Sequence, residues 1–186
     1  MSCSILAAGT IACGEVIDIT CQKRGELALR FPCFFAPAVS GNQELKFLKS
    51  MDMEKLEEEV CELCRKYSAD AVFRMGEGGI FRALWDLGIR LGCGLTVDLK
   101  KIPICQETIE ICEYADINPY EADSRGAVLI ACRDAGPLLM ALKERGIRAE
   151  LIGSMNGSKA KTLLYDGHVR YLDKPRRLKK PAFISS

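Results

Sequence analysis

The clearest pattern along the chain is a set of apolar residues at helical spacing. Five of them recur at intervals of three or four residues: Met53, Leu56, Val60, Leu63 and Tyr67. This spacing places them on one face of an α-helix, with glutamates filling most of the other face. We therefore predict an amphipathic helix in this region, with Ser50 or Asp52 as its N-terminal cap.

Shorter apolar runs predict the remaining elements. Strands are expected at residues 4–9, 71–73, 95–99, 127–132 and 149–153, and helices at residues 80–91, 106–114 and 134–143, the last of them capped by Asp134. Segment 127–132 is apolar at every position, which is typical of a central strand covered on both faces. Segment 14–24 fits either a strand or a short helix. Near the end of the chain, segments 162–165 and 168–172 flank Asp166-Gly167, a strong hairpin signal.

The alternation of strands and helices predicts the fold class. We expect an α/β (α+β) domain over residues 1–173, with helices packed on a β-sheet that ends in a β-hairpin. The hairpin makes the sheet mixed rather than purely parallel. Residues 174–186 are basic and contain two prolines, and we expect them to form a flexible, solvated tail rather than a nucleic-acid-binding arm.

Composition narrows the cellular setting and the partners. The net charge is only +1, which gives no field to attract nucleic acid. The ten cysteines accompany no recognisable secretion signal, so we expect a reduced, cytoplasmic protein with free thiols. No apolar run reaches the ~20 residues that a membrane-spanning helix needs.

A glycine-rich turn carries the most informative chemistry. Gly76, Glu77, Gly78 and Gly79 lie between a predicted strand and a predicted helix. Glycines let the backbone approach a ligand closely, and a helix N-terminus attracts anions. Arg74 would add a cation, so we interpret the turn as a phosphate or carboxylate site. The alternative is a tight turn that binds nothing, because neither the dinucleotide-binding spacing nor the Walker spacing is met.

Other candidates are weaker. Ser124, Arg125 and Gly126 belong to a polar loop before a buried strand, where binding residues are common, although a plain surface loop is the alternative. Cys61-x-x-Cys64 lies mid-helix without a second cysteine pair, which favours core packing over zinc or redox chemistry. With His168 as the sole histidine, we predict no metal site and no catalytic residue in this chain.

Two longer motifs resemble a known family. The run Glu77-Gly78-Gly79-Ile80-Phe81 and the segment 92–104 are similar to the C-terminal (PurM-type) domain of the aminoimidazole ribonucleotide synthase superfamily, above all to proteins related to the hydrogenase maturation factor HypE. Selenophosphate synthetase and thiamine-monophosphate kinase are more distant members. The resemblance covers nearly the whole chain and implies that segment 14–24 is helical.

This chain departs from the family pattern in two ways. Members usually carry an N-terminal half that binds ATP, and this chain aligns with the other half. The family motif before the helix has a histidine or arginine, an aspartate and a hydroxyl residue where this chain has Phe73, Arg74 and Gly76. A role that needs the aspartate is therefore not expected.

These departures leave three hypotheses. The first is a non-catalytic binding or regulatory module for an anionic or phosphorylated ligand. The second is a subunit of an ATP-dependent enzyme, with ATP bound only by a separate partner chain. The third is a structural or assembly protein. Self-association through an apolar face is also expected, with Phe34, Phe35 and Phe47 as candidates.

Overall fold

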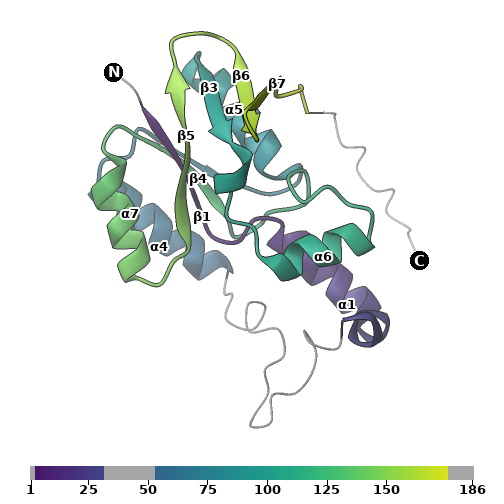
Figure 1. Ribbon diagram of the computed structural model, residues 1–186. Helices are drawn as coiled ribbons and strands as arrows, with labels where there is room; N and C mark the ends of the chain where they lie inside the picture. Colours follow the sequence, from purple (N-terminus) through teal and green to yellow (C-terminus); the bar gives the residue numbers. More distant parts are fainter. Residues whose placement is uncertain (1–2, 32–52, 176–186) are drawn as a thin grey trace, which may run out of the picture.

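A computed structural model describes residues 3–31 and 53–175 of the chain. Strands and helices alternate through most of this length (Figure 1). In chain order the elements are β1 (Ser4–Ala8), α1 (Cys13–Arg30), α4 (Met53–Lys66), β2 (Ala71–Arg74), α5 (Gly79–Leu91), β3 (Gly94–Asp98), a 3₁₀ turn (Leu99–Lys101), α6 (Gln106–Tyr114), β4 (Val128–Cys132), α7 (Ala135–Glu144), β5 (Ala149–Asn156), β6 (Lys161–Tyr165) and β7 (His168–Tyr171).

The strands form one seven-stranded mixed sheet in the order β2-β4-β1-β5-β3-β6-β7. Among the described strands only β3 and β6 pair in parallel, and every other neighbouring pair is antiparallel. The mixed α/β sheet is therefore confirmed, but it is more antiparallel than the strand–helix alternation suggested. The reason is that strands successive in the chain are mostly not neighbours in the sheet, so helical connections do not force parallel pairing.

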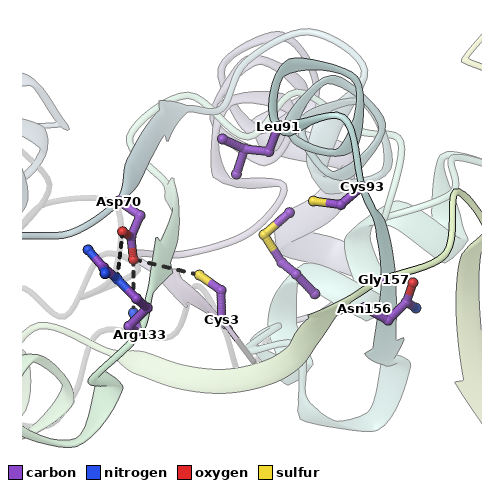
Figure 2. A pocket seen from close by; sticks show the side chains of 8 residues that line it. Cys3, Asp70, Leu91, Cys93, Arg133, Asn156 and Gly157 are labelled. Carbon is purple, nitrogen blue, oxygen red and sulfur yellow. Dashed lines mark hydrogen bonds and ion pairs between the residues drawn. The ribbon is translucent and has the colours of Figure 1, made fainter. Parts of the chain in front are cut away.

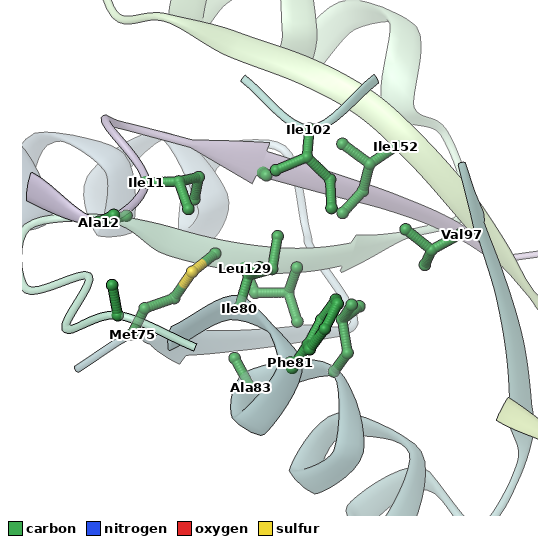
Figure 3. Packing of buried hydrophobic residues seen from close by; sticks show 14 of the residues in the cluster. Ile11, Ala12, Met75, Ile80, Phe81, Ala83, Val97, Ile102, Leu129 and Ile152 are labelled. Atoms are coloured by element: carbon green, nitrogen blue, oxygen red, sulfur yellow. The ribbon is translucent and has the colours of Figure 1, made fainter. Parts of the chain in front are cut away.

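Helices cover both faces of the sheet. Along β1, Ile5 and Ala7 belong to one core cluster, which α1, α5 and α6 complete, while Leu6 and Ala8 belong to a second cluster under α4 and α7. Figure 3 shows the first cluster, where Ile80 and Phe81 lie against the sheet residue Leu129. The central strands β1 and β4 are thus covered by helices on both faces, as expected for β4 from its unbroken apolar run.

Most predicted elements are confirmed within a few residues of their expected ends. Segment 14–24 is helical and forms part of α1. The Asp166-Gly167 turn joins β6 to β7, and both of its residues have positive φ, at 48° and 78°, as a type I′ turn requires. Asp134 is at the N-cap of α7, but its side chain makes no capping hydrogen bond there.

Some of the predicted residues lie outside the described part of the chain, and the remaining predictions concern individual side chains. Ser50, Asp52, Phe34, Phe35 and Phe47 fall in the former group, so the capping and self-association predictions at these positions stay predictions. Across the part of the chain that the structure describes, no disulfide joins Cys3, Cys21, Cys61, Cys64, Cys93, Cys105, Cys112 or Cys132. No helix in this part is both long and apolar enough to cross a membrane.

The Cys61-x-x-Cys64 pair lies on α4, and Cys64 packs in the second core cluster. Burial raises the pKa of the Cys64 thiol to about 12. His168 is exposed on β7. The search for groups of three or more His, Cys, Asp or Glu side chains that could hold a metal finds none within residues 3–31 and 53–175.

Candidate functional site

The glycine-rich turn connects β2 to α5 at one edge of the sheet. Gly78 is the N-cap of α5 and Gly79 its first residue, and their φ angles are 87° and 60°. Both angles lie in the left-handed region that glycine adopts without steric cost. Gly76 accepts hydrogen bonds at its carbonyl oxygen from the N–H groups of Gly79 and Ser124, and Glu77 is exposed. The turn is thus positioned as predicted, directly before a helix.

Gly79 packs against the loop between α6 and β4. A Cβ atom at this position would lie 2.5 Å from the carbonyl oxygen of Tyr120 and 2.6 Å from that of Ala122. The Tyr120 carbonyl also accepts the N–H of Phe81, 3.2 Å away. Two N–H groups near the start of α5, those of Gly79 and Phe81, are therefore engaged by the protein itself. An anion here would depend on side-chain cations as much as on backbone amides.

Arg74 directly precedes the turn, but its side chain is directed to another element. Its Nε atom is 3.2 Å from Glu57 Oε2 on α4, which covers the opposite face of the sheet from α5. The reason is strand alternation: Phe73 faces the α5 side, so Arg74, the next residue, faces away from it. Arg74 is thus paired with α4 in this structure, and its role as a cation at the start of α5 stays a prediction.

Ser124 is a structural residue in this arrangement. Its hydroxyl is buried, accepts the Ala12 N–H at 2.9 Å and donates to the Ala122 carbonyl at 3.0 Å. Ala12 is the N-cap of α1 and has φ 61°, so the serine holds a strained helix start in place. Both hydrogen-bonding functions of the hydroxyl are used inside the protein.

Arg125 and Gly126 also face neighbouring elements. Arg125 pairs with Asp18 of α1 at 2.6 Å and with Asp123 at 2.7 Å. Burial lowers the pKa of the Arg125 guanidinium, but these two carboxylates outweigh it and raise the pKa above its usual value. The Gly126 N–H donates to Glu57 Oε1. The side chains of Ser124 and Arg125 and the N–H group of Gly126 therefore fix α1 and α4, while the N–H group of Ser124 bonds the Gly76 carbonyl of the turn.

A cavity does open at the start of α5. Its volume is about 390 Å³, within the range of sites for small metabolites. It is lined by Gly78, Phe81, Arg82, Glu121, Arg170 and residues 172–175. Arg170 comes from β7 and its guanidinium lies 5.8 Å from the centre of the Phe81 ring, which stacks on Tyr120. We call this space, with its lining residues, the α5 cavity.

The α5 cavity contains cations that sequence analysis did not select. Arg82 follows Gly78 by one helical turn. The predicted helix over residues 80–91 could therefore have identified it as a neighbour of the turn. Arg170 and Lys174 offered no such signal, because only the placement of β7 beside β6 brings them to the start of α5. Arg82 forms an exposed pair with Asp86, Nε to Oδ2 2.9 Å, which is weak enough to exchange for a ligand.

Comparison with known proteins shows the fold. No family model matches the sequence, and no curated protein matches it either. Among solved structures, E. coli HypE, a hydrogenase maturation protein, superimposes with a TM-score of 0.69 and 20% identity over 96% of this chain and 51% of that one. A HypE in complex with ATP superimposes with a TM-score of 0.62 and 17% identity over 95% of this chain and 51% of that one.

Thiamine-monophosphate kinase from Stenotrophomonas maltophilia is more distant, with a TM-score of 0.55 and 14% identity over 89% of this chain and 50% of that one. Identities this low establish the fold alone. The chain has the fold that these proteins share, of the aminoimidazole ribonucleotide synthase type, and it spans about half the length of the HypE chains.

Proposed function

We propose that this chain is a binding or regulatory module for a small anionic ligand, such as a phosphorylated metabolite, held in the α5 cavity. The single observation that carries the proposal is the convergence of Arg82, Arg170 and Lys174 on a cavity at the N-terminus of a helix. Guanidinium groups bind phosphate or carboxylate oxygens through paired hydrogen bonds, and the helix start contributes partial positive charge.

The acidic residues of the same cavity limit which anions fit. Glu121 and Asp173 also line it and repel a ligand that is negatively charged throughout. Their carboxylates accept hydrogen bonds from hydroxyl or amine groups. The lining therefore favours a ligand with one anionic end and a hydrogen-bond-donating body over inorganic phosphate alone.

No residue of the α5 cavity forms a recognisable catalytic arrangement within the described residues. The cavity has no histidine or cysteine in its lining, and its two carboxylates, Glu121 and Asp173, share that lining with Arg82 and Arg170. The proposal is therefore one of ligand binding.

Isothermal titration calorimetry with a panel of phosphorylated metabolites, and with inorganic phosphate as the minimal probe, tests the proposal. We expect Arg170→Ala and Arg82→Ala each to weaken binding about 10-fold or more, since a charge-assisted hydrogen bond contributes about 1.5–3 kcal/mol. Arg74→Ala is the matched control, because that arginine lies on the other face of the sheet. Equal losses in all three variants, or no binding to the panel, would refute the α5 cavity as the site.

A second function rests on the half-length match to HypE in complex with ATP. In this alternative the chain is a subunit of an ATP-dependent enzyme, and a separate chain binds ATP. Affinity purification of the tagged protein from its own cells, followed by an ATPase assay, tests it. Recovery of an ATP-binding chain whose ATPase activity requires this protein would favour the subunit role. Failure to recover such a chain would leave the binding module alone.

We also propose a cytoplasmic location and self-association. Fractionation of cells tests the first, and sedimentation velocity tests the second. A strict monomer at micromolar concentration would contradict self-association.

A further inference from the structure

An open cavity lies at the C-terminal end of α5. Its volume is about 570 Å³, within the range of sites for small molecules. Figure 2 shows Asp70 and Arg133 on one side of it and Asn156 and Gly157 on the other. We call this space, with its lining residues, the Asp70 cavity. The rest of its lining consists of apolar or sulfur-containing side chains, those of Cys3, Leu91, Cys93 and Met155.

Asp70 and Arg133 form a fixed pair of opposite charges at this cavity. Arg133 Nε lies 3.0 Å from Asp70 Oδ1, and the Arg133 backbone N–H donates to Asp70 Oδ2 at 3.0 Å. These two contacts hold the guanidinium against the carboxylate, yet 66% of the Arg133 side chain is exposed. The pair therefore presents a cation and an anion together to a ligand.

The neighbouring side chains add no further charge. The Cys3 sulfur lies 3.8 Å from Asp70 Oδ2, and burial, followed by Asp70, raises the pKa of the Cys3 thiol to about 11. Cys3 is therefore a neutral thiol at physiological pH. Leu91, at the end of α5, lines the cavity and leaves 38% of its surface exposed. The cavity thus combines one charge pair with uncharged surface.

We propose that the Asp70 cavity binds a free α-amino acid with an apolar side chain, with leucine as the representative. The carboxylate of the ligand bonds the Arg133 guanidinium, its ammonium group bonds the Asp70 carboxylate, and its side chain lies against Leu91 and Met155. The site is at the opposite end of α5 from the α5 cavity and is independent of the proposed function.

The charge pair selects a zwitterion over simpler ions. A carboxylate without an amine is attracted by Arg133 but repelled by Asp70, and an amine without a carboxylate meets the reverse. A free amino acid carries both charges close together, so each charge finds its opposite. The ion pair between Asp70 and Arg133 is partly exposed and weak, so both groups can shift to accept the ligand.

The uncharged lining selects an apolar side chain. The Asn156 amide is already engaged, because its Oδ1 accepts the Ser158 N–H and its Nδ2 donates to Thr96 Oγ1. A polar ligand side chain would lose water here without gaining a new partner. An apolar side chain against Leu91 instead removes two apolar surfaces from water.

NMR spectroscopy of the full ¹⁵N-labelled chain, titrated with leucine, tests the proposal. We expect the amide resonances of Leu91, Arg133 and Gly157 to shift at millimolar leucine, and that of Gly78 in the α5 cavity to stay in place. Leucinamide lacks the carboxylate, N-acetyl-leucine lacks the ammonium group, and glycine lacks the apolar side chain. Each should bind about tenfold or more weakly than leucine, since each loses one of the three contacts.

Variants of the charge pair assign the two ends of the ligand. Arg133→Gln should weaken leucine binding about tenfold and remove the preference for leucine over leucinamide. Asp70→Asn should remove the preference for leucine over N-acetyl-leucine. Arg74→Gln is the matched control, because Arg74 is similarly exposed and also pairs with a carboxylate through Nε, but on α4 outside the Asp70 cavity.

A second matched pair tests the apolar contact. Leu91→Ser should weaken the binding of leucine but not that of glycine. Leu151→Ser, at a leucine that is 40% exposed and lies outside the lining, should change neither.

The analogue series on the unaltered chain needs no variant, so it decides the matter even where a variant does not fold. The proposal is overturned if millimolar leucine shifts none of the lining resonances, or if the analogues bind as tightly as leucine. Equal losses in Arg74→Gln and Arg133→Gln would overturn it as well.

Discussion

Replacing Gly79 with alanine tests how the start of α5 is packed. The substitution adds one methyl group at a residue whose φ is 60°. That methyl group would meet two backbone carbonyl oxygens, of Tyr120 at 2.5 Å and of Ala122 at 2.6 Å. Because both are backbone atoms, neither can move aside by rotating a side chain.

The expected loss has two parts. A non-glycine residue in the left-handed region costs about 1–2 kcal/mol, and moving packed backbone to admit a methyl group costs about 1–3 kcal/mol. Gly79→Ala should therefore lower the free energy of unfolding by about 2–5 kcal/mol. For a domain that is stable by about 5–15 kcal/mol, this corresponds to a fall in Tm of about 5–20 °C.

Urea and thermal unfolding followed by circular dichroism measure the loss of stability. Alanine substitutions at two other glycines separate the backbone cost from the packing cost. Gly92 has φ 65° but no heavy atom within 4 Å of an added Cβ, so Gly92→Ala reports the backbone cost alone. Gly76 has open space as well and no positive φ, so Gly76→Ala should change stability by less than about 0.5 kcal/mol. If Gly79→Ala costs no more than Gly92→Ala, the argument from the two carbonyls is wrong.

Three further changes can be followed in the same unfolding assay. Ser124→Ala removes the acceptor of the buried Ala12 N–H and should cost about 1–3 kcal/mol, whereas no loss would mean that the hydroxyl does not hold α1. Thr108→Val should stabilise by up to about 1 kcal/mol, because the Thr108 hydroxyl is buried without a hydrogen-bond partner, and a loss would show that it has one. Stability should also fall in alkali, because burial raises the pKa of three buried thiols to about 11–12, whereas thiols in the unfolded chain ionise near 9.0. The urea midpoint should be unchanged below about pH 8 and lower by about pH 10, and a flat profile would contradict this. The three thiols are Cys13, Cys64 and Cys112.

Local patterns were sufficient to predict most elements of the fold. The apolar stripe of α4, the all-apolar β4 and the Asp166-Gly167 turn each depend on short-range periodicity or turn chemistry, and each is confirmed. Strand direction was less accessible, because pairing depends on which strands become neighbours. Among the described strands the only parallel pair is β3 with β6, and it joins segments separated by the helices α6 and α7 and the strands β4 and β5, which no local pattern encodes.

The candidate site also has parts that the sequence could predict and parts that it could not. The glycine turn could be placed because glycines between a strand and a helix have a local meaning. The neighbours of the turn could not, since Arg74 is turned away by the pleat of β2 and Arg170 arrives from β7. Ser124 and Arg125 show a further limit: a polar loop residue looks the same in sequence whether it serves a ligand or a helix start.

The position of Arg170 on the last described strand also matters for the order of biosynthesis. Strands β1, β4 and β5 can pair while the final hairpin is still inside the ribosome, whereas the α5 cavity cannot form until β7 emerges and pairs with β6. A nascent chain therefore acquires its central sheet before it acquires the α5 cavity. Any ligand of the α5 cavity would then stabilise the β6–β7 hairpin only after β7 has been synthesised.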